Sequence, residues 1–135
     1  LTTIYGKACK LKIVSREKDV NKGAVYENVV AQELHAHGYP LYYYNSKKKG
    51  ELDFVIEHAG QVLPIEVKSG KDYEKHSALD NVMSVAEYGI EEAYVFTNDN
   101  VKAVGKLTYF PIYMVMFLQE DPIDFIDISV DRFKL

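Results

Sequence analysis

The chain has 135 residues, of which 47% are apolar and 27% are charged, and its formal net charge is −4. This size and composition are typical of one soluble globular domain and exclude a disordered or low-complexity protein. The longest apolar run, Phe110 to Leu118, is far shorter than the ~20 residues of a membrane helix. The first residues lack a secretory signal pattern, and the single cysteine, Cys9, excludes a disulfide framework. We therefore expect a cytoplasmic protein without a membrane partner.

The charge is unevenly distributed along the chain. Residues 1–75 carry 12 Lys/Arg and 10 Asp/Glu, whereas residues 76–135 carry 4 and 10. The acidic balance argues against a strongly basic nucleic-acid binder, although a local basic patch can still attract a polyanion. No P-loop, CxxC, HExxH or GxSxG motif occurs. Four histidines lack the spacing of metal ligands, and we expect surface or satisfied side chains there: His35, His37, His58 and His76.

The first clear pattern in chain order predicts a helix over residues 22–37. Residues 1–21 predict a short strand or helix followed by a polar linker, and the start at Leu1 favours a piece of a longer protein. In the helix, apolar residues recur at helical spacing until Gly38. Glu27 shares their stripe, where burying a carboxylate without a partner is costly. It therefore either faces water at the helix edge or belongs to a site.

Tyrosines dominate the next segment, residues 41–45, and predict a strand. We expect this strand in the core, and stacking of its tyrosines on nucleic-acid bases is the less favoured alternative. A loop with three adjacent lysines, Lys47, Lys48 and Lys49, follows. Such a run is usually a solvated loop, but the carboxylates that come next favour contact with phosphate here.

The segment from Gly50 to Gly70, GELDFVIEHAGQVLPIEVKSG, predicts two strands joined by a tight turn at residues 59 and 60. A turn there sets Asp53 opposite Glu66, and Glu51 opposite Lys68. Alternation places the acidic pair and the lysine on one face of the hairpin. The apolar residues that we expect on the other face are Leu52, Phe54, Ile56, Leu63, Ile65 and Val67.

Two carboxylates directly opposite each other in a strand pair repel. A compensating cation is therefore expected between Asp53 and Glu66, and a hard divalent ion such as Mg²⁺ suits such ligands. The alternative is a solvated hairpin face on which Glu51 and Lys68 form an ordinary exposed pair that contributes little.

The remaining chain predicts a helix over residues 71–88, with Lys71 and Lys75 near enough to its start to reach the site. Strands follow at 92–97 and 101–104. Residues 111–118 are apolar throughout and fit a strand or a helix, with Pro111 favouring the helix. The tail, 119–135, predicts an edge strand or a loose end. This order of elements predicts an α/β sandwich with a mixed central sheet.

Together these features resemble the PD-(D/E)XK nuclease superfamily: a helix glutamate, then G-E-x-D, then a hairpin into an apolar-E-apolar-K strand. Residues 22–118 more closely resemble the C-terminal domain of unknown function of prokaryotic AAA+ ATPases, with a Holliday-junction resolvase-like core. The segments that carry this resemblance are YENVVAQEL, YNSKKKGELDFVIE, VLPIEVKSGKDYEKHSALDN and TYFPIYMVMFL. It implies a restriction-endonuclease-like α/β/α sandwich at 22–118, flanked by the segments 1–21 and 119–135. It also implies an N-terminal AAA+ ATPase domain in a longer chain.

The resemblance further implies Mg²⁺ or Mn²⁺ held by Asp53, Glu66 and the carbonyl of Val67, with Glu27 completing the site directly or through water. Lys68 resembles the motif lysine that orients or activates the attacking water and offsets charge on the phosphate. The implied reaction is metal-assisted phosphodiester hydrolysis of DNA, including branched DNA. The residues expected to contact nucleic acid are Lys47, Lys48, Lys49, Lys71 and Lys75.

Three functions remain open from the sequence. The first is a metal-dependent endonuclease. The second is a catalytically silent nuclease-fold module that binds DNA or a partner, which the acidic net charge favours. The third is a dimerisation or docking domain that forms a homodimer, favoured by the apolar run at 110–118 and the tyrosine-rich sequence.

Overall fold

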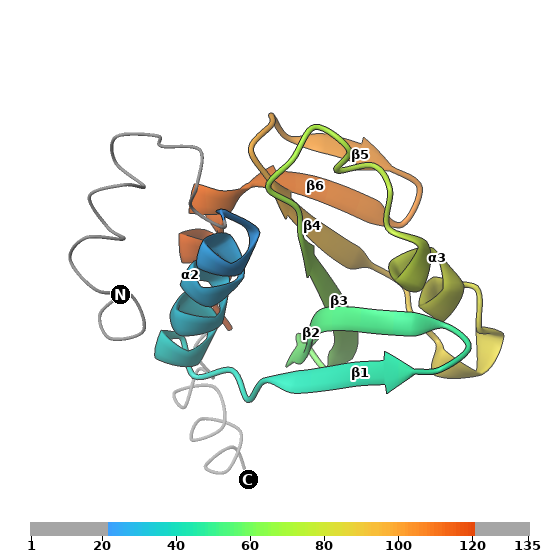
Figure 1. Cartoon of the computed structure of the whole chain (residues 1–135). Helices are drawn as coiled ribbons and strands as arrows, with labels where there is room; N and C mark the ends of the chain where they lie inside the picture. Colours follow the sequence, from blue (N-terminus) through green and yellow to red (C-terminus); the bar gives the residue numbers. More distant parts are fainter. Residues whose placement is uncertain (1–21, 121–135) are drawn as a thin grey trace, which may run out of the picture.

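The computed structural model describes residues 22–120 (Figure 1). The predictions for residues 1–21, and for the tail from residue 121 on, lie outside this range. The elements are α2 (Lys22–Ala36), β1 (Tyr42–Ser46), β2 (Gly50–His58), β3 (Gln61–Val67), α3 (Ser77–Met83), η1 (Ala86–Tyr88), β4 (Ala93–Thr97), β5 (Lys102–Val104), β6 (Leu107–Pro111) and η2 (Ile112–Phe117). Among these residues no helix is long and apolar enough to span a bilayer.

The six strands form one mixed sheet in the order β1-β2-β3-β4-β6-β5. β1, β2 and β3 are antiparallel, β3, β4 and β6 are parallel, and β5 pairs antiparallel with β6. The predicted α/β class with a mixed sheet is therefore confirmed. β6 is an additional strand, because the sequence analysis predicted no element between residues 104 and 111.

Two apolar clusters cover the two faces of the sheet. Adjacent residues of β4 point to opposite faces, since Val95 belongs to one cluster and Phe96 to the other. The α2 cluster joins α2 and η2 to the sheet through Val30, Leu34, Tyr39, Phe54, Ile56, Leu63, Ile65, Val67, Phe96, Val115 and Leu118. The α3 cluster joins α3 to the other face through Leu52, Leu79, Val82, Ile90, Ala93, Val95 and Tyr109.

The β2–β3 hairpin has the predicted register. Phe54 pairs with Ile65, and His58 pairs with Gln61. The turn residues Ala59 and Gly60 have φ values of 51° and 75°. Two consecutive left-handed residues are the geometry of a tight hairpin turn, which a small residue followed by glycine favours.

A β-bulge interrupts the pairing of β1 with β2. Tyr42 pairs with Val55 and Tyr44 pairs with Leu52, so Asp53 and Phe54 both lie opposite the single residue Tyr43. The extra residue shifts the alternation of β2. Leu52 consequently packs in the α3 cluster while Phe54 packs in the α2 cluster. The prediction that these two residues share a face was therefore wrong for Leu52.

Two further predictions need correction. The predicted helix over 71–88 is a short α3 followed by η1, because His76 adopts a non-helical backbone conformation with φ −142° and Val85 is extended. The tyrosine strand is not a core strand: β1 is the edge of the sheet, where Tyr42 and Tyr43 are 59% and 71% exposed. Of the two alternatives for residues 111–118, the structure has the helical one, as a 3-10 helix over residues 112–117 instead of an α-helix.

Candidate functional site

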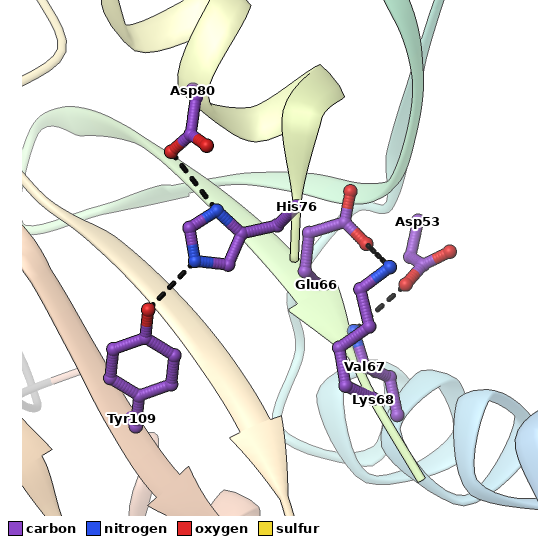
Figure 2. A network of polar contacts seen from close by, with 7 residues as sticks. All are labelled: Asp53, Glu66, Val67, Lys68, His76, Asp80 and Tyr109. Carbon is purple, nitrogen blue, oxygen red and sulfur yellow. Dashed lines mark hydrogen bonds and ion pairs between the residues drawn. The ribbon is translucent and has the colours of Figure 1, made fainter. Parts of the chain in front are cut away.

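The candidate site lies at the end of the β2–β3 ladder, next to the Phe54–Ile65 pair, and Figure 2 shows its side chains. Asp53 occupies the bulge, and its Oδ2 accepts a hydrogen bond of 2.8 Å from the backbone N–H of Val67. The carboxylate thus satisfies a backbone donor of β3. This bond fixes the orientation of Asp53 beside the strand that carries Glu66.

Glu66 is a buried carboxyl group, with only 4% of its surface exposed. Its Oε2 lies 3.7 Å from the ammonium nitrogen of Lys68, and Figure 2 shows Asp53 on the other side of that ammonium group. Burial, and then the charge of Asp53, raise the pKa of Glu66 to about 8, although Lys68 opposes the rise. Near neutral pH the pair therefore retains a proton instead of carrying two full charges.

Glu27 approaches the same place from α2. Burial first, and then the charge of Asp53, raise the pKa of the half-buried Glu27 carboxyl, while Lys68 lowers it. The helix glutamate is therefore within electrostatic range of the hairpin residues. Within residues 22–120, however, no three His, Cys, Asp or Glu side chains are close enough together to hold one metal ion.

The chemistry of the donor set can be tested against a divalent cation. Asp53 and Glu66 offer carboxylate oxygens, and one partly exposed ammonium group opposes them. Mg²⁺ in proteins is typically held by one or two carboxylates together with waters and substrate phosphates. Without a cation, repulsion between the two carboxylates favours a proton on one of them. A divalent ion would relieve the same repulsion, so this pair of ligands fits such an ion.

The other predicted site residues are more scattered. Glu51 is exposed, and Lys68 pairs with Glu66 instead of with Glu51. Lys75 forms an exposed pair of 3.1 Å with Asp72. Four other lysines were expected to contact nucleic acid, at the β1–β2 turn and after β3: Lys47, Lys48, Lys49 and Lys71. In the described part of the chain none of them is ion-paired with the site carboxylates.

The sequence reading did not find a buried polar network beside the site (Figure 2). His76 shares a hydrogen bond of 2.7 Å between its Nε2 and the hydroxyl of Tyr109, and its Nδ1 lies 3.0 Å from Asp80 Oδ1. An acid four residues after a histidine at the start of a helix is a weak signal for this contact. Nothing local to His76 indicates Tyr109. The network ties the start of α3 to β6 through the Nε2 of His76. The buried Nδ1 lies near Asp80 but makes no hydrogen bond within residues 22–120, so the expectation of a satisfied histidine holds for only one of its ring nitrogens.

The pKa of Glu66 predicts a pH dependence of stability. The folded protein holds a proton on Glu66 between the ordinary pKa of 4.5 and about 8, whereas the unfolded chain releases it. Stability should therefore fall as pH rises through this window, by roughly 1 kcal/mol per pH unit from this group. Glu66→Gln cannot titrate, so its free energy of unfolding should depend less on pH.

Urea denaturation of the metal-free protein at a series of pH values measures this difference. Glu57→Gln is the matched control, because Glu57 is an exposed acid on β2, the strand that pairs with the strand of Glu66. Parallel stability curves for the wild type and Glu66→Gln would contradict the raised pKa.

Comparisons with known proteins leave the biochemical role open. A family model described as Domain of unknown function (DUF4143) matches residues 22–114. This range runs from the start of α2 into η2 and contains Glu27, Asp53, Glu66 and Lys68. Neither the curated proteins nor the solved structures include a significant match to the chain.

Proposed function

The chain belongs to the DUF4143 family of domains of unknown function, and from this premise we propose that it is a metal-dependent DNA endonuclease. Its architecture in this proposal is the restriction-endonuclease-like α/β/α sandwich of the PD-(D/E)XK type. The observation that supports it best is the convergence of Asp53, Glu66 and Lys68 where the β2–β3 ladder ends. A buried glutamate with a raised pKa, beside a second carboxylate and a lysine, is typical of functional sites.

In this proposal Asp53 and Glu66 hold one Mg²⁺ or Mn²⁺ ion, with the carbonyl of Val67 as a further ligand. Glu27 lies near enough to act through water and to strengthen the negative potential. The bound ion would polarise the phosphate and lower the pKa of a bound water. No side-chain nucleophile is required.

Lys68 has a double role in the proposal. Its ammonium group lies 3.7 Å from Glu66 Oε2, and about a third of the side chain remains exposed, with 33% accessible. It can therefore contact the metal ligands on one side and a phosphate arriving from solvent on the other. A fixed positive charge at that position stabilises the negative charge that develops on the phosphate and orients the attacking water.

The proposed partners follow from the family resemblance and from the lysines around the site. DNA, branched DNA included, contacts the lysines at 47–49 together with Lys71 and Lys75. An N-terminal AAA+ ATPase domain in a longer chain is the proposed intramolecular partner, a homodimer is the proposed assembly, and the cytoplasm is the proposed location.

The test is a nicking assay on supercoiled plasmid and on synthetic branched and linear DNA. With Mg²⁺ or Mn²⁺ we expect strand cleavage, and with EDTA we expect none. Cleavage that is independent of the divalent ion would contradict the mechanism. Ion binding without cleavage of any of these substrates would favour the catalytically silent module.

A further inference from the structure

Two tyrosine rings are exposed on the edge strand β1. Tyr42 and Tyr43 are 59% and 71% exposed, more than the intermediate burial that is usual for tyrosine. The Tyr43 ring lies 6.0 Å from the ring of Phe54, centroid to centroid, at a tilt of 53°. Because Phe54 is buried in the α2 cluster, Tyr43 has a fixed neighbour on one side and solvent over most of its surface.

The third tyrosine of the strand, Tyr44, packs against another ring of the same chain. Tyr44 is partly buried, and its ring lies edge-on to Tyr88 at 6.2 Å. The Lys49 ammonium group lies 5.0 Å from the centroid of the same Tyr88 ring. The rings that β1 offers to solvent are therefore those of Tyr42 and Tyr43.

The bulge places Tyr43 next to the candidate site. Asp53 and Phe54 both lie opposite Tyr43 in the β1–β2 pair. Neighbouring strands are separated by about 4.8 Å. A nucleotide strand whose phosphate reached Asp53 would therefore have an adjacent base within reach of the Tyr43 ring.

Positive charge lies at the end of the same strand. Lys47 and Lys48 are exposed, and neither is ion-paired within residues 22–120. Their turn is anchored, because the Lys49 N–H donates to Ser46 Oγ at 3.4 Å and Asn81 Nδ2 donates to the Lys49 carbonyl at 3.2 Å. Exposed aromatic rings combined with cations are typical of proteins that bind single-stranded nucleic acid.

We propose that Tyr43 stacks on an unpaired base, with Lys47 and Lys48 contacting the phosphates that follow. The substrate class of the site is then single-stranded nucleic acid, or the unpaired strand at a branch. This inference rests on the proposed function and adds the form of nucleic acid that the site takes. A duplex shields its base faces by stacking, so Tyr43 selects against it.

The experiment measures fluorescence anisotropy of a labelled oligothymidylate and of a blunt duplex of equal length, with Ca²⁺ replacing Mg²⁺. We expect the single strand to bind more tightly. Tyr43→Ala should weaken that binding by roughly tenfold, the usual size of one lost stacking contact, while Tyr43→Phe should keep it. Tyr113→Ala is the matched control, because Tyr113 is 68% exposed but lies on η2; it should bind like the wild type. Circular dichroism checks the fold of each variant.

Equal affinity for duplex and single strand, or wild-type binding by Tyr43→Ala, would overturn the inference. Self-association that Tyr43→Ala removes, without any effect on nucleic acid, would also overturn it and assign the β1 edge to a second copy of the chain. Single-strand binding that needs Tyr43, without cleavage in Mg²⁺ or Mn²⁺, would support the stacking site and contradict the endonuclease. Metal-dependent cleavage that is indifferent to Tyr43 would contradict only the stacking site.

Discussion

Lys68→Ala is expected to slow metal-dependent strand cleavage by at least about 100-fold, the usual cost of removing one donor that stabilises transition-state charge. Lys68 is the cation that pairs with buried Glu66 at 3.7 Å, and part of it faces solvent. Its removal takes positive charge away from the position where the phosphate would arrive. Since Asp53 and Glu66 remain, the variant should still bind Mn²⁺ and should still fold.

Single-turnover nicking rates at saturating Mn²⁺ measure this effect. Lys106→Ala is a suitable control, because Lys106 is a partly exposed lysine that pairs with Glu91 at 3.9 Å and donates to the carbonyl of Ile90. It should cleave like the wild type. If Lys68→Ala also cleaved at the wild-type rate, Lys68 would have no part in the reaction.

Asp53→Asn is expected to weaken Mn²⁺ binding by at least about 100-fold and to abolish cleavage. Loss of an outer-shell partner of a metal site typically costs about 10- to 100-fold, and a direct carboxylate ligand should cost at least as much. The amide can still accept the 2.8 Å hydrogen bond from the Val67 N–H, so the end of the hairpin should keep its geometry. The substitution therefore removes charge while it preserves shape.

Calorimetric titration with Mn²⁺ compares this variant with the wild type. Asp53→Ala removes both the charge and the hydrogen-bond acceptor, so it should lose stability as well as ion binding. A stable Asp53→Asn protein that binds Mn²⁺ as the wild type does would place the ion elsewhere or remove it from the mechanism.

The parts of the fold that depend on neighbouring residues follow from the sequence. The hairpin register needs only a turn at residues 59 and 60 and two alternating strands, and the observed pairing of Phe54 with Ile65 agrees. Helix α2 ends before Gly38, which has a φ of 87° that favours glycine. The predicted Asp53–Glu66 pair is not part of this ladder, which ends at Phe54 and Ile65, and Asp53 instead accepts a hydrogen bond from the N–H of Val67.

The parts that failed depend on contacts between distant segments. The late start of α3 accompanies the bond from His76 to Tyr109, which lies 33 residues further along the chain. Alternation alone does not indicate the bulge, so the opposite packing of Leu52 and Phe54 was missed. Lys68 follows β3 directly and pairs with Glu66, two residues before it, and a cross-strand register cannot indicate that choice.

The bulge also affects how this site can evolve. Because Asp53 and Phe54 share one partner on β1, the position of Asp53 depends on the number of residues in β2. Point substitutions at position 53 leave the number of residues in β2 unchanged. Deletion of one β2 residue at the bulge would instead restore a regular strand and move the Asp53 side chain to the other face of the sheet. Relatives can therefore gain or lose a carboxylate here by a single codon change on the same backbone. Under the proposed mechanism, a chain with this carboxylate and a chain without it would share one fold and differ only in the atoms at the end of this side chain.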